Sequence, residues 1–149
     1  MRILMVCLGN ICRSPMAQAI MESLVREKGL DWIIDSAGTN GLHDGESPDD
    51  RAIEEIKRRG LKIGQQRSRK IHKSDGENFD LILTMDYYIL NECKKIFANK
   101  PHLKIECIMN FVSPSEVVED PYYDGSFDKA FDKIEAGCRV ILHRYLKHY

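Results

Sequence analysis

Apolar positions along the chain follow two patterns. Residues 3–6 form a short continuous apolar run, which is typical of a strand buried on both faces of a parallel sheet, and the apolar-rich segments 32–34, 79–85 and 105–109 are predicted to be the other three strands. Between and after these runs, apolar residues recur every three or four positions, which is the spacing of an amphipathic helix. This alternation predicts a domain of the α/β class.

Capping residues and glycines indicate where four helices begin and end. A serine or aspartate precedes each helical pattern, and such side chains accept hydrogen bonds from the first free backbone N–H groups. The predicted N-caps are Ser14, Ser47, Asp86 and Ser126. The first two helices end at Gly29 and Gly60. Residues 61–78 and 110–125 show neither pattern and are expected to be loops, and a loop as long as the second is usually functional.

The order of these elements predicts one three-layer α/β domain over residues 1–149. It contains a four-stranded parallel sheet joined by right-handed crossovers. We expect a flavodoxin-like doubly wound topology, in which ligands bind beyond the carboxyl ends of the strands. The loop after the first strand lies at that edge and is the expected phosphate-binding loop.

Composition and charge narrow the classes of function. The chain has 149 residues and 43% hydrophobic content, enough to bury a core without disulfides or metals. Its 22 basic and 23 acidic residues give a formal net charge of −1, whereas nucleic-acid-binding proteins are usually basic. The longest apolar run, residues 3–8, is too short for a membrane span, and no lipidation motif is present. We expect a cytoplasmic protein without a nucleic-acid partner or a membrane anchor.

The cysteines are odd in number and include no Cys-x-x-Cys pair. This pattern fits neither a disulfide framework nor a zinc site with four ligands. Reduced thiols and no metal site are therefore expected, which leaves at least one thiol for chemistry. The five cysteines are Cys7, Cys12, Cys93, Cys107 and Cys138.

The segment after the first strand reads Cys-Leu-Gly-Asn-Ile-Cys-Arg-Ser-Pro at residues 7–15. Five residues between Cys7 and Arg13 suffice for backbone N–H groups to curl around a tetrahedral oxyanion, and Gly9 and Asn10 tolerate the positive φ angles required. The planar guanidinium of Arg13 is suited to bind two phosphate oxygens. The same positive field favours a thiolate at Cys7, and a thiolate is the nucleophilic form of cysteine.

The sequence resembles the low-molecular-weight protein tyrosine phosphatases over nearly its whole length. Five ordered motifs carry the resemblance: residues 7–15, Ser-Ala-Gly-Thr at 36–39, Ser-Pro-Asp-Asp-Arg at 47–51, Thr-Met-Asp at 84–86 and Asp-Pro-Tyr-Tyr at 120–123. The resemblance implies hydrolysis of phosphate monoesters, without metal or cofactor. The implied substrates are phosphotyrosine-containing proteins or small aryl phosphates, with inorganic phosphate as product and inhibitor.

The resemblance assigns catalytic roles to Cys7, Arg13 and Asp120. Cys7 is implied to attack phosphorus and form a cysteinyl-phosphate, while Arg13 and the loop N–H groups stabilise the phosphoryl oxygens. Asp120 is implied to protonate the leaving phenolate and then to activate water. The implied phosphate-binding residues are Leu8, Gly9, Asn10, Ile11, Cys12, Arg13 and Ser14.

A supporting network is expected around Asn10, whose backbone we predict to be left-handed. The resemblance implies Ser14 and Ser36 as its hydrogen-bond partners, and the Ser14 hydroxyl is also expected to bond the thiolate. Relatives carry a histidine where this chain has Gln66. Either the Gln66 amide replaces that histidine in the network, or the alignment slips and His72 contributes.

The predicted pocket walls determine substrate choice. Tyr122 and Tyr123 resemble the aromatic pair with which the family stacks on a phosphotyrosine ring. On the facing loop, many relatives carry Trp or Tyr where this chain has Leu42, next to His43. This departure leaves the substrate preference within the class open.

Two roles are considered for Cys12, which lies five positions after Cys7. The resemblance implies a reversible Cys7–Cys12 disulfide that protects the nucleophile, and the alternative is a small buried loop residue. The other three cysteines, Cys93, Cys107 and Cys138, fall on apolar faces and are expected in the core.

Three alternatives share part of this pattern. A thioredoxin-coupled arsenate reductase has the same fold and Cys-x5-Arg loop, but it needs two further redox cysteines close together on a mobile segment. Here thirteen residues separate Cys93 from Cys107. A phosphocarrier subunit of a sugar transport system has a cysteine after its first strand but needs no counterpart of Arg13 or Asp120. A phosphopeptide-binding module without turnover would leave all three catalytic residues idle.

Overall fold

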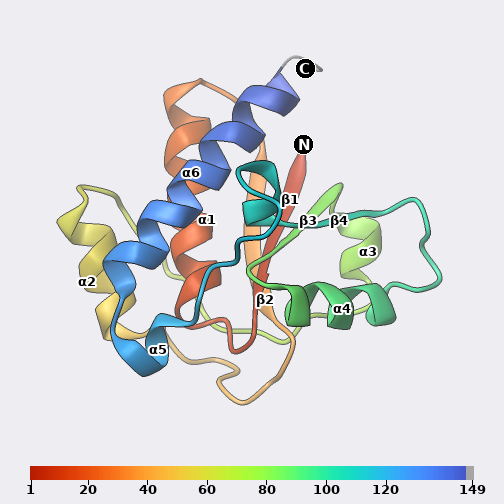
Figure 1. The fold of residues 1–149 in the computed structure, drawn as a ribbon, viewed down its shortest axis with the longest axis horizontal. Coiled ribbons are helices and arrows are strands. Elements are labelled where there is room, and N and C mark those ends of the chain that lie inside the picture. The colour runs from red at the N-terminus through yellow and green to blue at the C-terminus, as the bar shows by residue number, and fades with distance from the viewer. Residues whose placement is uncertain (147–149) are drawn as a thin grey trace.

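A computed structural model describes residues 1–146 as a parallel sheet with helices on both faces (Figure 1). The strands are β1 (Arg2–Cys7), β2 (Ile33–Gly38), β3 (Leu81–Thr84) and β4 (Lys104–Cys107). All pairs are parallel and the spatial order is β2-β1-β3-β4. This order confirms the predicted flavodoxin-like fold, and it places the topological switch point between β1 and β3.

The helices form two layers. One face of the sheet is covered by α1 (Arg13–Glu27) and α6 (Phe127–Leu146), with α2 (Asp50–Arg58) packed beside them. The other face is covered by α3 (Asp75–Asn78) and α4 (Tyr87–Ile96). The 3-10 helix η1 (Ile108–Phe111) follows β4, and the short helix α5 (Pro121–Asp124) precedes α6. No helix among the described residues is both long and apolar enough to cross a membrane.

β1 is buried on both faces, which explains its continuous apolar run. Ile3 and Met5 belong to the core beneath α1 and α6, while Leu4 and Val6 belong to the core beneath α4. Successive side chains of a strand point to opposite faces, so a central strand between two helical layers needs apolar residues at every position.

The strand boundaries differ from the predictions. β1 is one residue longer at each end than residues 3–6, and β3 is shorter than residues 79–85. β2 extends beyond residue 34 to Gly38 because it pairs with β1 as far as Cys7 opposite Gly38. Asp35 and Ser36 concealed this extension, since polar residues interrupt the apolar run. β4 ends at Cys107 rather than at residue 109, and the chain continues into η1.

Two predicted helix caps are wrong. α1 begins at Arg13, so Ser14 lies inside the first turn and Cys12 occupies the N-cap position without a side-chain bond. α2 is capped by Asp49 rather than by Ser47, because the Asp49 carboxylate accepts a backbone hydrogen bond from the first turn. The segments 61–78 and 110–125, predicted as loops, contain α3 and α5.

Candidate active site

A pocket of about 200 Å³ opens at the carboxyl edge of the sheet. Its lining comes from three segments that lie far apart in the sequence: Cys7–Arg13, residues 40–43 and residues 120–123. The first segment includes the β1–α1 loop, residues 8–12, which joins the central strand to the helix behind it. The pocket therefore lies where open parallel sheets usually bind ligands.

The turn of the β1–α1 loop depends on Asn10. Its φ is 59°, which makes it the one non-glycine residue with a positive φ among residues 1–146. The buried side-chain amide donates to Ser14 Oγ at 2.8 Å, and its oxygen accepts from the Arg69 backbone N–H at 3.0 Å. Asparagine tolerates the left-handed region better than most residues, and these two bonds hold it there as predicted.

Two neighbouring segments support the loop from outside. The Ser68 hydroxyl donates to the Gly9 carbonyl oxygen at 2.8 Å. Gly38, at the end of β2, approaches so closely that a Cβ on it would lie 2.8 Å from the Leu8 carbonyl oxygen. The loop backbone is thus held between the end of β2 and the segment around Ser68.

The Cys7 sulfur lies 3.0 Å from Ser14 Oγ, and both groups are buried. Ser14 Oγ already accepts a hydrogen bond from Asn10, so its own hydrogen is free to point at the sulfur. A hydroxyl donor stabilises a thiolate more than a neutral thiol. With one hydroxyl group, Ser14 therefore contacts the Cys7 sulfur and holds the shape of the loop.

Arg13 is held by two partners from other parts of the chain. Its Nη1 donates to Asp86 Oδ2 at 2.7 Å and to the Val118 carbonyl oxygen at 2.8 Å. Burial acts to lower the pKa of Arg13, but the charges of Cys7, Asp86 and Asp120 outweigh it and raise that pKa. The guanidinium therefore stays charged at the edge of the pocket.

Asp86 is a site residue whose role the sequence analysis missed. It caps α4 as predicted, because its Oδ1 accepts from the Ile89 N–H at 2.9 Å, while its Oδ2 bonds Arg13. Its position directly after β3 was the available signal, since the carboxyl ends of β1 and β3 lie side by side in the sheet.

Asp120 approaches the pocket from the opposite side. It is the N-cap of α5, and its Oδ1 accepts from the Tyr122 N–H at 3.1 Å. Its Oδ2 lies 3.7 Å from Arg13 Nη2. One carboxylate oxygen is therefore fixed by the helix cap, and the other faces the guanidinium across the pocket.

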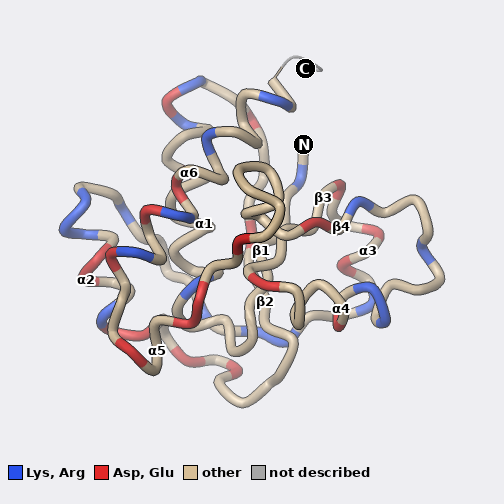
Figure 2. Tube along the Cα trace, in the orientation of Figure 1, with Lys and Arg blue, Asp and Glu red and all other residues tan. Residues whose placement is uncertain are grey.

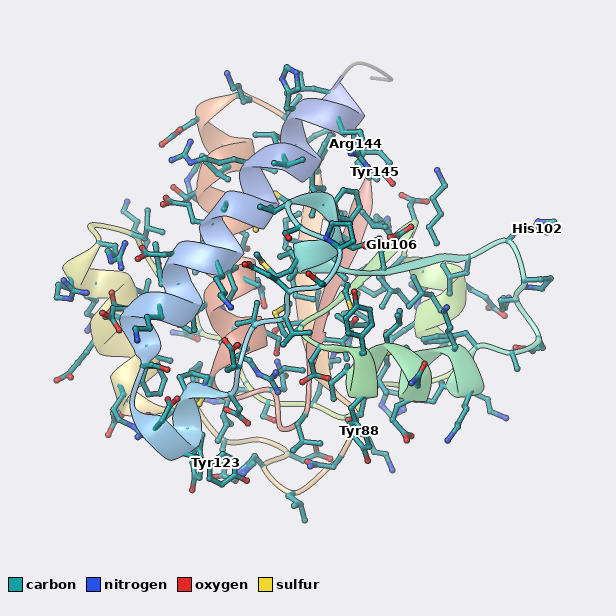
Figure 3. The ribbon with its side chains drawn as sticks, in the orientation of Figure 1. Tyr88, His102, Glu106, Tyr123, Arg144 and Tyr145 are labelled. Atoms are coloured by element: carbon teal, nitrogen blue, oxygen red, sulfur yellow. The ribbon has the colours of Figure 1, made fainter. Side chains whose placement is uncertain are left out.

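All four predicted wall residues line the pocket, together with Asn40. The rings of Tyr122 and Tyr123 meet edge to face, with centroids 5.2 Å apart. Figure 3 shows Tyr123 at the tip of α5, and its side chain is 80% exposed. Leu42 on the facing side is equally exposed, while the His43 Nδ1 lies 2.9 Å from Glu46 Oε2. The opening of the pocket is thus lined by Tyr122 and Tyr123 on one side and by the aliphatic side chain of Leu42 on the other.

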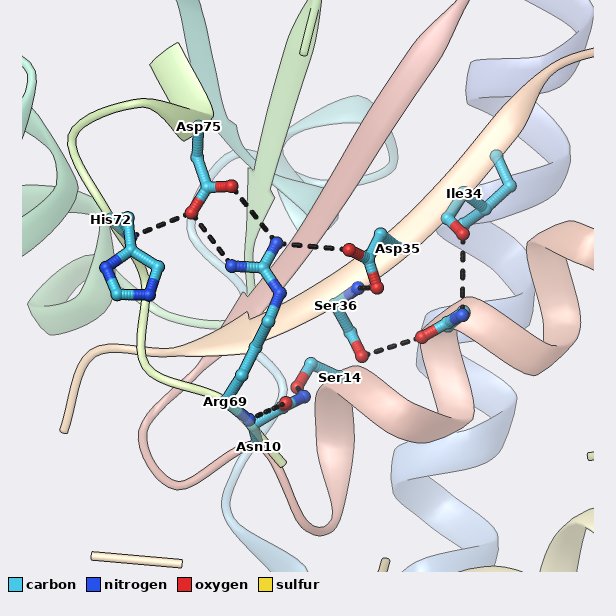
Figure 4. A network of polar contacts seen from close by, with 9 residues as sticks. Asn10, Ser14, Ile34, Asp35, Ser36, Arg69, His72 and Asp75 are labelled. Carbon is cyan, nitrogen blue, oxygen red and sulfur yellow. Dashed lines mark hydrogen bonds and ion pairs between the residues drawn. The ribbon is translucent and has the colours of Figure 1, made fainter. Parts of the chain in front are cut away.

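The prediction that Ser36 and Gln66 join the Asn10 network is wrong. The Ser36 hydroxyl donates to Gln18 Oε1 at 2.7 Å, because β2 presents it to α1 (Figure 4). Gln66 Nε2 instead donates to the Pro15 carbonyl oxygen at 3.3 Å, and its Oε1 is buried without a partner among the described residues. His72 is exposed and bonds Asp75 through its backbone, so it does not take that place either.

Arg69 supplies the missing part of the network (Figure 4). Its backbone N–H bonds Asn10, while its guanidinium bonds both carboxylate oxygens of Asp75 and also Asp35 Oδ2. The same segment pairs with the end of β2 through a bridge between Gly38 and Lys70. The polar composition of residues 61–78 gave no sign of this anchoring.

The five cysteines are free thiols and all are buried. Cys93, Cys107 and Cys138 lie in the core as predicted. Cys12 lies at the pocket, where burial and the nearby charges of Asp49, Cys7 and Asp120 raise its pKa. Across residues 1–146, no group of three or more His, Cys, Asp or Glu side chains is placed to hold a metal ion.

Comparisons with known proteins agree with this geometry. The family model described as "Low molecular weight phosphotyrosine protein phosphatase" matches residues 2–148. The chain is 38% identical over 146 residues to the low molecular weight protein-tyrosine-phosphatase YfkJ of Bacillus subtilis, covering 94% of this chain and 92% of that protein. It is 36% identical over 149 residues to the human low molecular weight phosphotyrosine protein phosphatase, covering 95% and 94% of the two chains.

Solved structures also resemble this chain over nearly its whole length. The crystal structure of YfkJ superposes with a TM-score of 0.94 at 35% identity, over 99% of this chain and 96% of that chain. A Drosophila protein described as an arginine phosphatase superposes with a TM-score of 0.92 at 36% identity, over 97% and 98% of the two chains. The match of sequence and fold over nearly the full length shows that this chain belongs to the low molecular weight protein-tyrosine phosphatase family.

Proposed function

We propose that this protein hydrolyses phosphotyrosine in proteins, and small aryl phosphates, through a cysteinyl-phosphate intermediate. The observation that carries the proposal is the convergence on one pocket of Cys7 and Arg13, from one segment, and Asp120, from a segment more than 100 residues away. A nucleophile, a cation and an acid placed around one small volume are the groups that metal-free phosphoryl transfer requires.

In the first step, the Cys7 thiolate attacks phosphorus and the bond from phosphorus to the phenolic oxygen breaks. The Asp120 carboxyl gives its proton to the departing phenolate. Arg13 and the N–H groups of the β1–α1 loop bind the equatorial phosphoryl oxygens, where negative charge is concentrated in the transition state. The products of this step are a phenol and the cysteinyl-phosphate.

In the second step, the Asp120 carboxylate takes a proton from water as the water oxygen attacks phosphorus. The bond from sulfur to phosphorus breaks, and the Cys7 thiolate and inorganic phosphate are released. Ser14 stabilises the departing thiolate because its hydroxyl lies 3.0 Å from the sulfur. Inorganic phosphate fits the same cradle and is therefore a competitive inhibitor.

The aromatic rim supports an aryl substrate. The perpendicular rings of Tyr122 and Tyr123 offer a face and an edge to a phosphotyrosine ring seated above the phosphate. Leu42 contributes an aliphatic contact, and we propose that this opposite wall tolerates a wider range of rings than a tryptophan would.

Cys12 is proposed to protect the nucleophile. Peroxide converts the Cys7 thiolate to a sulfenic acid with release of hydroxide, and the Cys12 thiol then displaces water to form the disulfide. The raised pKa of Cys12 keeps it protonated, so Cys7 is the thiol that is oxidised first. That all five cysteines are free supports a reducing compartment such as the cytoplasm.

One assay tests the proposal. Protein purified in EDTA is expected to hydrolyse phenyl phosphate and a phosphotyrosine peptide, and Cys7→Ser is expected to lose turnover while still binding inorganic phosphate. Wild-type protein that binds phosphate without turnover would indicate a phosphopeptide-binding module instead. Arsenate reduction coupled to thioredoxin is the readout for the arsenate reductase alternative.

A phosphoarginine peptide belongs in the same assay, because one similar structure is described as an arginine phosphatase. We expect phosphotyrosine to be preferred, since the rim offers aromatic contacts rather than a carboxylate aimed at a guanidinium. A higher kcat/KM for phosphoarginine would contradict the aryl assignment and leave the hydrolytic mechanism intact.

A further inference from the structure

Arg51, in the first turn of α2, is held by more contacts than an exposed arginine usually makes. Its guanidinium lies over the ring of Tyr122 at 5.3 Å and over the ring of Phe127 at 4.8 Å, measured to the centroids. Its Nε and Nη2 donate to the two carboxylate oxygens of Asp49 at 3.0 and 3.1 Å. The side chain is 45% exposed, yet its charged group contacts two aromatic rings and one carboxylate.

Through its contact with Tyr122, Arg51 is connected to Asp120, the proposed general acid. The Tyr122 N–H is the donor that fixes Asp120 Oδ1. α5 has only four residues, so it has no stability of its own and depends on the surfaces that its side chains touch. The guanidinium of Arg51 is one such surface, and it fixes the residue that orients the carboxylate.

Through its contact with Asp49, Arg51 is also connected to the β1–α1 loop. The Asp49 N–H donates to the Ile11 carbonyl oxygen at 2.8 Å, and the Asp49 carboxylate also caps α2. Figure 1 shows α5 at the lower end of α6 and α2 to the left of α6. The first turn of α2 therefore connects the loop that carries Cys7 and Arg13 with the helix that carries Asp120.

We propose that Arg51 is a positioning residue for the general acid: it clamps Tyr122 so that the Asp120 carboxylate stays above the β1–α1 loop. This inference rests on the proposed function, and it adds a role for a residue outside the pocket lining. Arg51 does not line the pocket and contacts the aryl site only through Tyr122, so its loss should affect proton transfer and leave phosphate binding unchanged.

The dependence of the rate on the leaving group distinguishes a loss of acid positioning from a general loss of activity. Phenyl phosphate needs a proton on its departing oxygen, whereas 2,4-dinitrophenyl phosphate does not. A general acid contributes about 10²–10⁴-fold, and a misplaced acid loses part of that. The comparison uses kcat/KM, which reports the first step, because both substrates share the hydrolysis of the cysteinyl-phosphate. We expect Arg51→Ala to lower kcat/KM for phenyl phosphate by roughly tenfold. For 2,4-dinitrophenyl phosphate we expect kcat/KM to change by less than about twofold.

Combining variants shows whether Arg51 acts through Asp120. Residues that act as a unit give non-additive effects. Once Asp120→Asn has removed the acid, the further change to Arg51→Ala should cost phenyl phosphate turnover less than about twofold. Arg51→Lys keeps the charge beside Asp49 but loses the planar stack, so it is expected to lie between wild type and Arg51→Ala.

Arg59 provides a matched control at the other end of α2. Its guanidinium lies 4.4 Å from the centroid of the Phe131 ring, and it pairs with Glu55 and Asp132. Arg59→Ala removes comparable contacts between α2 and α6 at a site away from α5. It is expected to lower Tm without changing the ratio of the two kcat/KM values.

The outcomes are distinct. If Arg51→Ala slows both substrates equally, or slows neither, the positioning role is overturned. If it reduces phenyl phosphate turnover as much in the Asp120→Asn background as in wild type, Arg51 acts by a route other than the acid. If Asp120→Asn itself fails to discriminate between the leaving groups, the acid assignment in the proposed function fails, whatever Arg51 does.

Discussion

Ser14 Oγ lies 3.0 Å from the sulfur of Cys7 and also accepts a hydrogen bond from Asn10. One hydroxyl thus connects the nucleophile to the residue with the left-handed turn. The sequence predicted an N-cap at this position, but the helix begins one residue earlier and directs the hydroxyl towards the pocket. The chemistry of the loop and its shape are therefore coupled through Ser14.

Replacing Ser14 with alanine tests that coupling. Hydrogen bonds to charged groups contribute about 1.5–3 kcal/mol, so we expect kcat to fall roughly 10- to 100-fold. The thiolate should also become less available, which is measured as slower alkylation of Cys7 by iodoacetate at pH 7. A Cys12→Ser background restricts the alkylation to Cys7 at the pocket. Alkylation at the wild-type rate would contradict the role of the hydroxyl.

Asp86 serves both as the cap of α4 and as the partner of Arg13, and two variants separate these roles. Serine keeps a capping oxygen, whereas alanine does not. We expect Asp86→Ser and Asp86→Ala to weaken inhibition by phosphate to the same extent, because both lose the bond to Arg13. Asp86→Ala should be less stable than Asp86→Ser by about 1 kcal/mol in denaturant melts. Unchanged phosphate inhibition in Asp86→Ser would show that Arg13 needs no carboxylate partner.

Gly38 leaves no room for a side chain against the β1–α1 loop. A Cβ there would lie 2.8 Å from the Leu8 carbonyl oxygen, which is backbone and has no freedom to rotate away. Gly38→Ala is therefore expected to destabilise the protein by about 1–3 kcal/mol and to lower phosphatase activity. Gly64→Ala is the control, since nothing lies within 4 Å of its Cβ position. It should change the free energy of unfolding by less than about 0.5 kcal/mol.

The pairing of Asp49 with Arg51 predicts a pH-dependent contribution to stability. The hydrogen bond from Arg51 outweighs burial and lowers the pKa of Asp49. A carboxyl whose pKa is lowered by folding stabilises the fold at pH values above its pKa in the unfolded chain, about 3.9. This contribution is lost as the pH falls through its pKa in the folded protein. Asp49→Asn keeps the cap but removes the charge, so its Tm should be below that of wild type at pH 7.

The same variant tests the direction of this pH dependence. The difference in Tm between wild type and Asp49→Asn should be constant from pH 7 to 5 and disappear as the pH falls through the lowered pKa of Asp49 in the folded protein, where its carboxyl becomes protonated. Asp44, exposed on the neighbouring loop, supplies the control Asp44→Asn, for which no such difference is expected. A difference that persists at low pH would assign the effect to packing instead of charge.

The number of charged residues in the sequence did not predict the site, whereas the positions of a few charged side chains in the structure define it. Figure 2 shows acidic and basic residues distributed along most of the chain, in keeping with the net charge of −1. The positive charge that matters is the single buried guanidinium of Arg13, which three separated segments surround. A phosphate site of this kind needs no basic protein, because the loop N–H groups and one arginine concentrate the positive field.

The sequence by itself determined the order of strands and helices, the loop from Cys7 to Arg13 and the left-handed Asn10. These depend on periodicity, on local turn chemistry and on a motif of nine consecutive residues. It also identified Asp120, Tyr122 and Tyr123, although only through the family motif, because an Asp-Pro turn in an isolated chain has no distinctive chemistry.

Tertiary structure alone decided which distant residues complete the site. Asp86, Ser68 and Arg69 reach the β1–α1 loop because β3 and the end of β2 lie beside β1 in the sheet, a neighbour relation that no local pattern records. The same geometry removes Ser36 and Gln66 from the network, since β2 turns one toward α1 and the other lies against Pro15. Local propensity fixes how each segment folds, whereas the partners of a side chain depend on the packing of the whole sheet and its helices.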